Sequence, residues 1–108
     1  MSNEYSLAIA FRLDRTRFES DYDQRYAQLK ATLSEFAIGG AWDDTTSLVL
    51  MKTHADPHKV AKALTIGLHR SHDVLLVHIV GRDFGYLFGD AANEAELTVM
   101  SGMKIERV

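Results

Sequence analysis

A single aspartate at the end of a strand-like segment is the residue that best fits a chemical role. Residues 5–13 alternate between bulky and small or polar side chains, so Asp14 falls on the same face as Ala8 and Ala10. If two copies of the chain meet through that face, a two-fold axis brings two Asp14 carboxylates together. Magnesium often binds one or two protein carboxylates plus water, and it can activate that water. The alternative is that Asp14 only ends the strand and caps the next turn.

Basic and aromatic side chains offer weaker signals for nucleic-acid binding. Arg12, Arg15 and Arg17 can form bidentate hydrogen bonds with phosphate, although ion pairs with the acidic residues that follow explain them equally well. Trp42 and Tyr86 can stack on the bases of single-stranded RNA, but aromatic residues of a core or an interface need no ligand. The five histidines lack further ligands at the spacing of a zinc site.

Composition limits the class of protein. A chain of 108 residues is expected to form one domain, and cysteine is absent, so disulfides and thiolate metal sites are excluded. The net charge of -3 argues against strong non-specific binding to nucleic acid. The first residues have neither a basic start nor an unbroken apolar run, so we expect no signal peptide, no membrane partner and a cytoplasmic location.

The periodicity of apolar residues predicts the elements that position Asp14. A strand over 5–13 is followed by a helix that begins near Ser20 and stops at Gly39, with apolar residues three and four apart. Two short strands, 40–43 and 46–53, form a hairpin. Asp56 and Pro57 then start a second helix, and residues 73–80 form a fourth strand. This order predicts an α+β, ferredoxin-like βαββαβ domain over residues 1–108, with a core at 5–80, a four-stranded antiparallel sheet and two helices on one face.

The C-terminal part, residues 81–108, adds an extra strand and a less regular tail. Alternation over 84–88 predicts the strand, residues 91–97 suggest a short helix, and residues 98–108 form either a hairpin at 101–102 or a loose end.

A dimer follows from the apolar residues on both faces of the strand at 73–80. The face that the helices leave uncovered is costly in water, and a second copy is its commonest cover. The predicted dimer interface consists of Ala8, Ala10, His78, Phe84, Tyr86 and Phe88.

Four segments, in order, resemble a known superfamily. They are AIAFRLD at 8–14, DYDQRYAQL at 21–29, WDDTTSLVLMKT at 42–53 and HDVLLVHI at 72–79. Together they are similar to the small CRISPR-associated adaptation protein that partners the spacer integrase, and to its VapD-like relatives, most of all their uncharacterised stand-alone bacterial branch.

This resemblance implies a ferredoxin-like protomer, a homodimer formed through the sheet, and a C-terminal strand that can add to a partner's sheet. In some members it also implies cleavage of RNA that depends on magnesium or manganese, for which Asp14 is the catalytic and metal-binding position here. Other members are scaffolds. Two functions therefore stay open: a divalent-metal endoribonuclease, and a non-catalytic module that binds another protein through the C-terminal strand.

Overall fold

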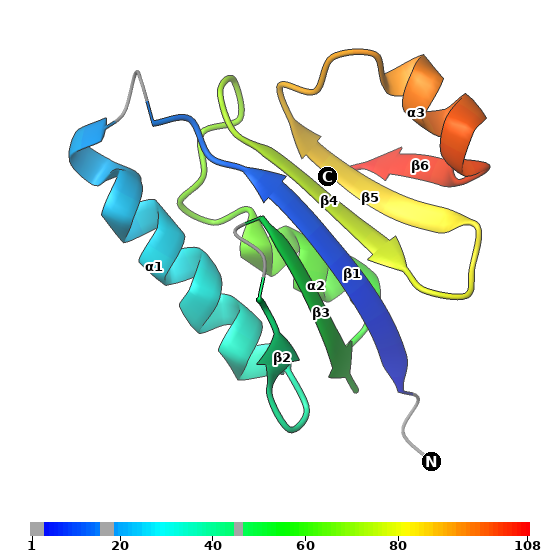
Figure 1. The fold of residues 1–108 in the computed structure, drawn as a ribbon, viewed down its shortest axis with the longest axis horizontal. Coiled ribbons are helices and arrows are strands. Elements are labelled where there is room, and N and C mark those ends of the chain that lie inside the picture. The colour runs from blue at the N-terminus through cyan, green and yellow to red at the C-terminus, as the bar shows by residue number, and fades with distance from the viewer. Residues whose placement is uncertain (1–3, 16–18, 45–46) are drawn as a thin grey trace.

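A computed structural model describes residues 4–15, 19–44 and 47–108 of the protein. These residues form one six-stranded sheet and three helices (Figure 1). In chain order, the elements are β1 (Tyr5–Arg12), α1 (Glu19–Phe36), β2 (Ala41–Trp42), β3 (Leu48–Thr53), α2 (Pro57–Leu64), β4 (Val74–Ile79), β5 (Phe84–Gly89), α3 (Glu94–Ser101) and β6 (Lys104–Arg107). The predicted α+β class is confirmed.

The first six elements occur in the predicted order because their signals are local. Alternation in β1 places Leu7, Ile9 and Phe11 on one buried face. At the start of α2, the side chain of Asp56 accepts a hydrogen bond from the amide of His58 at 3.4 Å, and proline at the first helical position costs no hydrogen bond. Helix α2 ends at Leu64, although apolar residues at helical spacing continue to Leu68 in the sequence.

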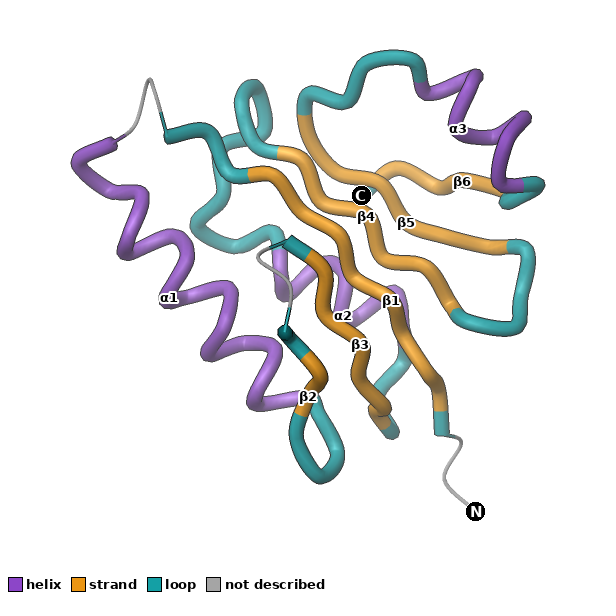
Figure 2. Tube along the Cα trace, viewed as in Figure 1, coloured by secondary structure: helices purple, strands orange, loops and turns teal. Residues whose placement is uncertain are grey.

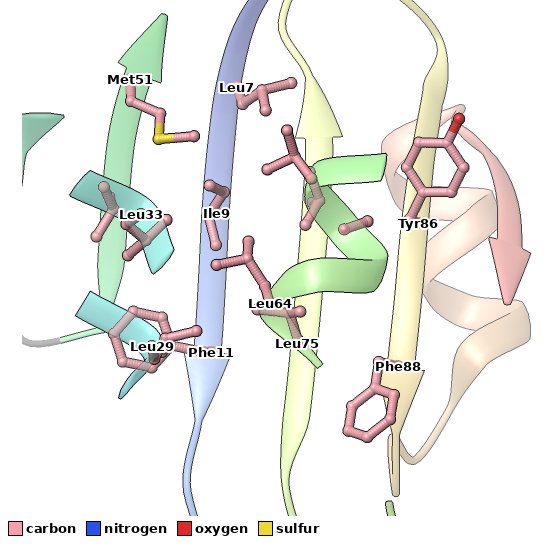
Figure 3. Close-up of a cluster of buried hydrophobic side chains, with 14 of the residues drawn as sticks. Leu7, Ile9, Phe11, Leu29, Leu33, Met51, Leu64, Leu75, Tyr86 and Phe88 are labelled. Carbon is pink, nitrogen blue, oxygen red and sulfur yellow. The ribbon is translucent and has the colours of Figure 1, made fainter. Parts of the chain in front are cut away.

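The sheet has the strand order β2-β3-β1-β4-β5-β6. All neighbouring pairs are antiparallel except β5 and β6, which are parallel. In the register, Ile9 lies opposite Val49 on β3 and Val77 on β4, so one face of the sheet carries a continuous apolar layer. Figure 3 shows this layer meeting Leu29 and Leu33 of α1 and Leu64 of α2. The core therefore lies between the sheet and these two helices.

The prediction of a four-stranded sheet is wrong, since β5 and β6 extend it to six strands. The extra strand predicted at 84–88 is confirmed as β5. Residues 98–108 form neither the hairpin nor the loose end expected of them: α3 continues to Ser101, and β6 then pairs with β5 in parallel.

The handedness of crossover connections explains where α3 lies. The connections β1–α1–β2 and β5–α3–β6 each join two parallel strands, and all four of these strands run in the same direction. The first connection leads towards the β2 edge of the sheet and the second towards the β6 edge. Since such crossovers are almost always right-handed, α1 and α3 must lie on opposite faces. Leu97 of α3 accordingly lines a hollow together with Ala10, Leu76 and Leu87, which point away from the core. The face opposite the core is therefore partly covered, at its β5 end.

Both edges of the sheet are poor templates for strand addition. Strand β2 has two residues, and β6 carries the charged side chains of Lys104, Glu106 and Arg107. Short and charged edges are the usual protection against edge-to-edge association. Strand β5, predicted to recruit a partner, is paired on both sides, with β4 and with β6. In the described part of the chain, no helix combines the length and the apolar character needed to cross a membrane.

Candidate functional site

A buried ion pair joins three distant segments at one end of the sheet. Arg25 of α1 donates from Nη1 to both carboxylate oxygens of Asp73, at 2.8 and 3.0 Å. Asp73, just before β4, is fully buried, and the side chain of Arg25 is 3% exposed. The end of β1, the start of β4 and the end of β5 all lie at this end of the sheet (Figure 2).

Asp73 is also the acceptor for two backbone amides. The amide of Asp14 donates to it at 2.7 Å and that of His69 at 2.8 Å, while Nη2 of Arg25 donates to the carbonyl of Asp14 at 2.6 Å. Nε of Arg25 donates to Asp21 at 2.9 Å. Burying two charges is favourable only when their remaining donors and acceptors are paired in this way. We call Arg25, Asp73 and the groups bonded to them the Arg25–Asp73 centre.

The Arg25–Asp73 centre changes the ionisation of its members. Burial alone lowers the pKa of Arg25, but hydrogen bonds and charge from Asp21 and Asp73 outweigh burial and leave this pKa raised. The hydrogen bond from Arg25 is the largest cause of the lowered pKa of Asp21, and the His69 ring, 3.1 Å from Asp21, adds to it. At neutral pH the centre therefore contains an arginine cation and an ionised Asp21.

Asp14, the predicted catalytic residue, lies two residues after Arg12, the last residue of β1, and its backbone is hydrogen-bonded to the Arg25–Asp73 centre. Its carboxylate lies 3.7 Å from Nδ1 of His72, in the loop between α2 and β4, and the two side chains are 17% and 25% exposed. At 3.7 Å the two side chains are in range of a charge interaction, at a distance longer than a hydrogen bond, and an imidazole in a partly exposed position can take part in proton transfer.

The predicted phosphate-binding arginines differ in their surroundings. Arg12 is exposed, with a hydrogen bond of 3.5 Å to the carbonyl of Asp90, and the guanidinium of Arg15 lies 5.1 Å from the centre of the Tyr22 ring. Arg17 lies outside the described residues. In the described part of the chain, no group of three or more His, Asp or Glu side chains could hold a metal ion.

The second candidate site is the sheet face opposite the core. The register aligns Trp42, Leu50, Ala8 and His78 in one row across β2, β3, β1 and β4. Trp42 is 48% exposed and Leu50 is 41% exposed, and Val80, next to this row, is 48% exposed. Ala8, Ala10 and His78, predicted to contact a second copy, lie on this face, which we call the open face.

The other three predicted interface residues lie on the core side. Phe88 pairs with Leu75 and Tyr86 with Val77, whose side chains point to the helices α1 and α2. Tyr86 and Phe88 are buried within the protomer (Figure 3), and Phe84 packs partly buried against the same core. A contact across the open face would not include them.

The sequence contained a signal for the Arg25–Asp73 centre, although the periodicity of apolar residues alone did not reveal it. Arg25 is four residues before Leu29 and eight before Leu33, so it lies on the apolar stripe of α1, where a charge is unexpected. Asp73 likewise opens the most apolar strand. Two opposite charges at core positions predict a buried pair.

Comparison with known proteins gives no relative for this arrangement. No family model matches the chain, and no curated protein and no solved structure matches it.

Proposed function

We propose that the protein is a homodimeric assembly module with a ferredoxin-like core, which associates through the open face of its sheet. The strand order β4-β1-β3-β2, with α1 and α2 on one side, supports the ferredoxin-like core. The four sequence segments that resemble the CRISPR-adaptation and VapD-like superfamily support the same proposal, since that resemblance implies a dimer formed through the sheet.

The observation that carries this proposal is the row of exposed apolar side chains on the open face. Trp42 and Leu50 lie on β2 and β3, beside β1, which presents the small side chains Ser6, Ala8 and Ala10 on this face and Arg12 at its end. A furrow of small residues beside bulky apolar residues is self-complementary. A two-fold axis can place the bulky side chains of each copy over the furrow of the other copy. Burial of this surface supplies the free energy of association.

Sedimentation equilibrium of the wild type and of Leu50→Asp tests the dimer. We expect a wild-type dimer and a dissociation constant at least about 100-fold higher for Leu50→Asp, because a carboxylate would be buried without a partner. Ile66→Asp is the matched control: this side chain is 64% exposed, follows α2 on the core side of the sheet, and should leave the dimer unchanged. A wild type that stays monomeric at high concentration, or equal constants for the two variants, would refute the assembly function.

We propose RNA cleavage as a second candidate function, because a carboxylate and an imidazole, those of Asp14 and His72, lie close together and partly exposed. A neutral imidazole can accept the proton of a ribose 2′-hydroxyl as that oxygen bonds to the neighbouring phosphorus and the P–O5′ bond breaks. The products are a 2′,3′-cyclic phosphate and a 5′-hydroxyl, whose proton comes from the imidazolium or from water. The test is cleavage of single-stranded RNA by wild type, Asp14→Ala and His72→Ala, with magnesium, with manganese and with a chelator. Loss of cleavage in both variants supports the pair, and a chelator-sensitive activity supports the metal that the resemblance implies. Intact RNA with the wild type under all three conditions rules this function out.

A further inference from the structure

A hollow under α3 opens on the open face. It has a volume of about 340 Å³. Its lining is mostly apolar and includes Ala10, Leu76, Leu87, Ala91 and Leu97, with Arg12 at the rim. Small alanine side chains and the lack of any buried residue in α3 explain why the helix does not fill this space. The hollow is therefore a ready site for one large apolar side chain.

The open face also carries a side chain of the matching kind. Trp42 lies on the edge strand β2, opposite Leu50, and is 48% exposed. An indole buries roughly 150–250 Å² when it is fully enclosed, and a cation over its ring adds to the attraction. Arg12 supplies such a cation at the hollow. Trp42 and the hollow lie on the same face but on opposite sides of β1, so Trp42 cannot reach the hollow of its own chain.

A two-fold axis can bring Trp42 of one copy to the hollow of the other. Trp42 is two strands from β1 on one side and level with Ala8, whereas the hollow covers β4 and β5 on the other side, level with Ala10 and Arg12. An axis in the plane of contact that crosses β1 between Ala8 and Ala10 exchanges the two positions. The axis then passes over the smallest side chains of the face, where two sheets can approach closely.

The area of the contact favours this arrangement over a flat one. The contact area of a flat arrangement follows from the width of four neighbouring strands and the length of the eight residues of β1. These dimensions are roughly 19 by 26 Å, which gives a flat area of about 500 Å² per copy. Stable interfaces need about 800 Å² per partner. Seating each Trp42 under the partner's α3 extends the contact to β5 and α3 and reduces this shortfall.

We propose that Trp42 of each protomer inserts into the hollow between α3 and the sheet of its partner and is the central contact of the dimer. This inference rests on the proposed assembly function and identifies its partner as a second copy of the chain. The site is complete only when the partner contributes Trp42.

The experiment uses Trp42 itself as the probe, because the chain contains one tryptophan. Fluorescence emission and acrylamide quenching are followed on dilution of the wild type, next to sedimentation equilibrium of the same samples. We expect a blue-shifted, quencher-protected Trp42 in the dimer and a red-shifted, accessible one after dissociation. Ala91→Phe should fill the hollow, weaken the dimer about 30-fold and expose Trp42, as expected for loss of an aromatic hot spot.

Ala95→Phe is the matched control, since this residue is exposed on α3 and does not line the hollow. Circular dichroism checks that both variants fold. A dimer whose Trp42 emission and quenching equal those of the monomer would overturn the insertion but leave the assembly function intact. The absence of a wild-type dimer would instead overturn the assembly function itself.

Discussion

Replacement of Asp73 by asparagine tests the structural role of the Arg25–Asp73 centre. The carboxylate of Asp73 accepts hydrogen bonds from Arg25 and from the amides of Asp14 and His69. Asparagine keeps the shape of the side chain, but it replaces one acceptor oxygen with an NH2 group. This NH2 group is itself a donor, so it cannot accept the hydrogen bonds that the lost oxygen accepted. It also leaves the buried Arg25 without its fully buried counter-charge.

The expected loss in free energy of unfolding is about 3–5 kcal/mol, as for other buried ion pairs from which one partner is removed. A domain of this size has about 5–15 kcal/mol in total, so the variant should lose between about a fifth and all of its free energy of unfolding. Because the slope of unfolding in urea is about 1–3 kcal/mol per molar, the urea midpoint should fall by more than about 1 M.

The assay is equilibrium unfolding in urea, followed by circular dichroism, with Asp90→Asn as the control. Asp90 is exposed at the end of β5, and its replacement should change stability by less than about 0.5 kcal/mol. If Asp73→Asn itself does not fold, the double variant Arg25→Met/Asp73→Asn decides the matter. Removal of the lone cation should restore folding, so the double variant should show a measurable unfolding transition in urea where Asp73→Asn shows none. Equal midpoints for Asp73→Asn and Asp90→Asn would refute the reasoning.

Two further predictions concern the same end of the sheet. The pKa of Asp21 is lowered by its hydrogen bond to Arg25, so its contribution to stability is complete above its ordinary pKa of 3.8 and is lost as the pH falls below that value. Asp21→Asn should therefore flatten the acid limb of a stability–pH profile, and an unchanged slope below pH 3.8 would contradict this. At Gly89, φ is +97° and an added Cβ would lie 1.8 Å from the carbonyl oxygen of Asp73, whereas at Gly81, with φ +87°, it would meet open space. Gly81→Ala should lower the free energy of unfolding by about 1–2 kcal/mol, and Gly89→Ala should lower it clearly more. Urea unfolding measures both losses, and similar losses would show that the close approach of Gly89 to Asp73 is unimportant.

Local sequence patterns were sufficient to predict the type and order of the helices and strands in the first 80 residues. Alternation placed Ile9 and its neighbours in a strand, three- and four-residue spacing placed Leu29 and Leu33 on one helix face, and Asp56 with Pro57 marked a helix start. Each of these signals acts within a few residues, so it can be read without knowledge of the fold. The sequence also indicated a second apolar face, from β4, although the occupant of that face is a proposal.

Only the tertiary structure decided how the C-terminal segment and the charged residues are used. Strand β6 is largely charged and α3 buries no residue, so neither has a strong periodic signal, and the handedness of the β5–α3–β6 crossover placed α3 on the open face. Arg25 and Asp73 are 48 positions apart and meet only when α1 packs against the start of β4. Pairing between distant positions depends on the assembled layers, because a charge tolerates burial only where the fold brings its partner.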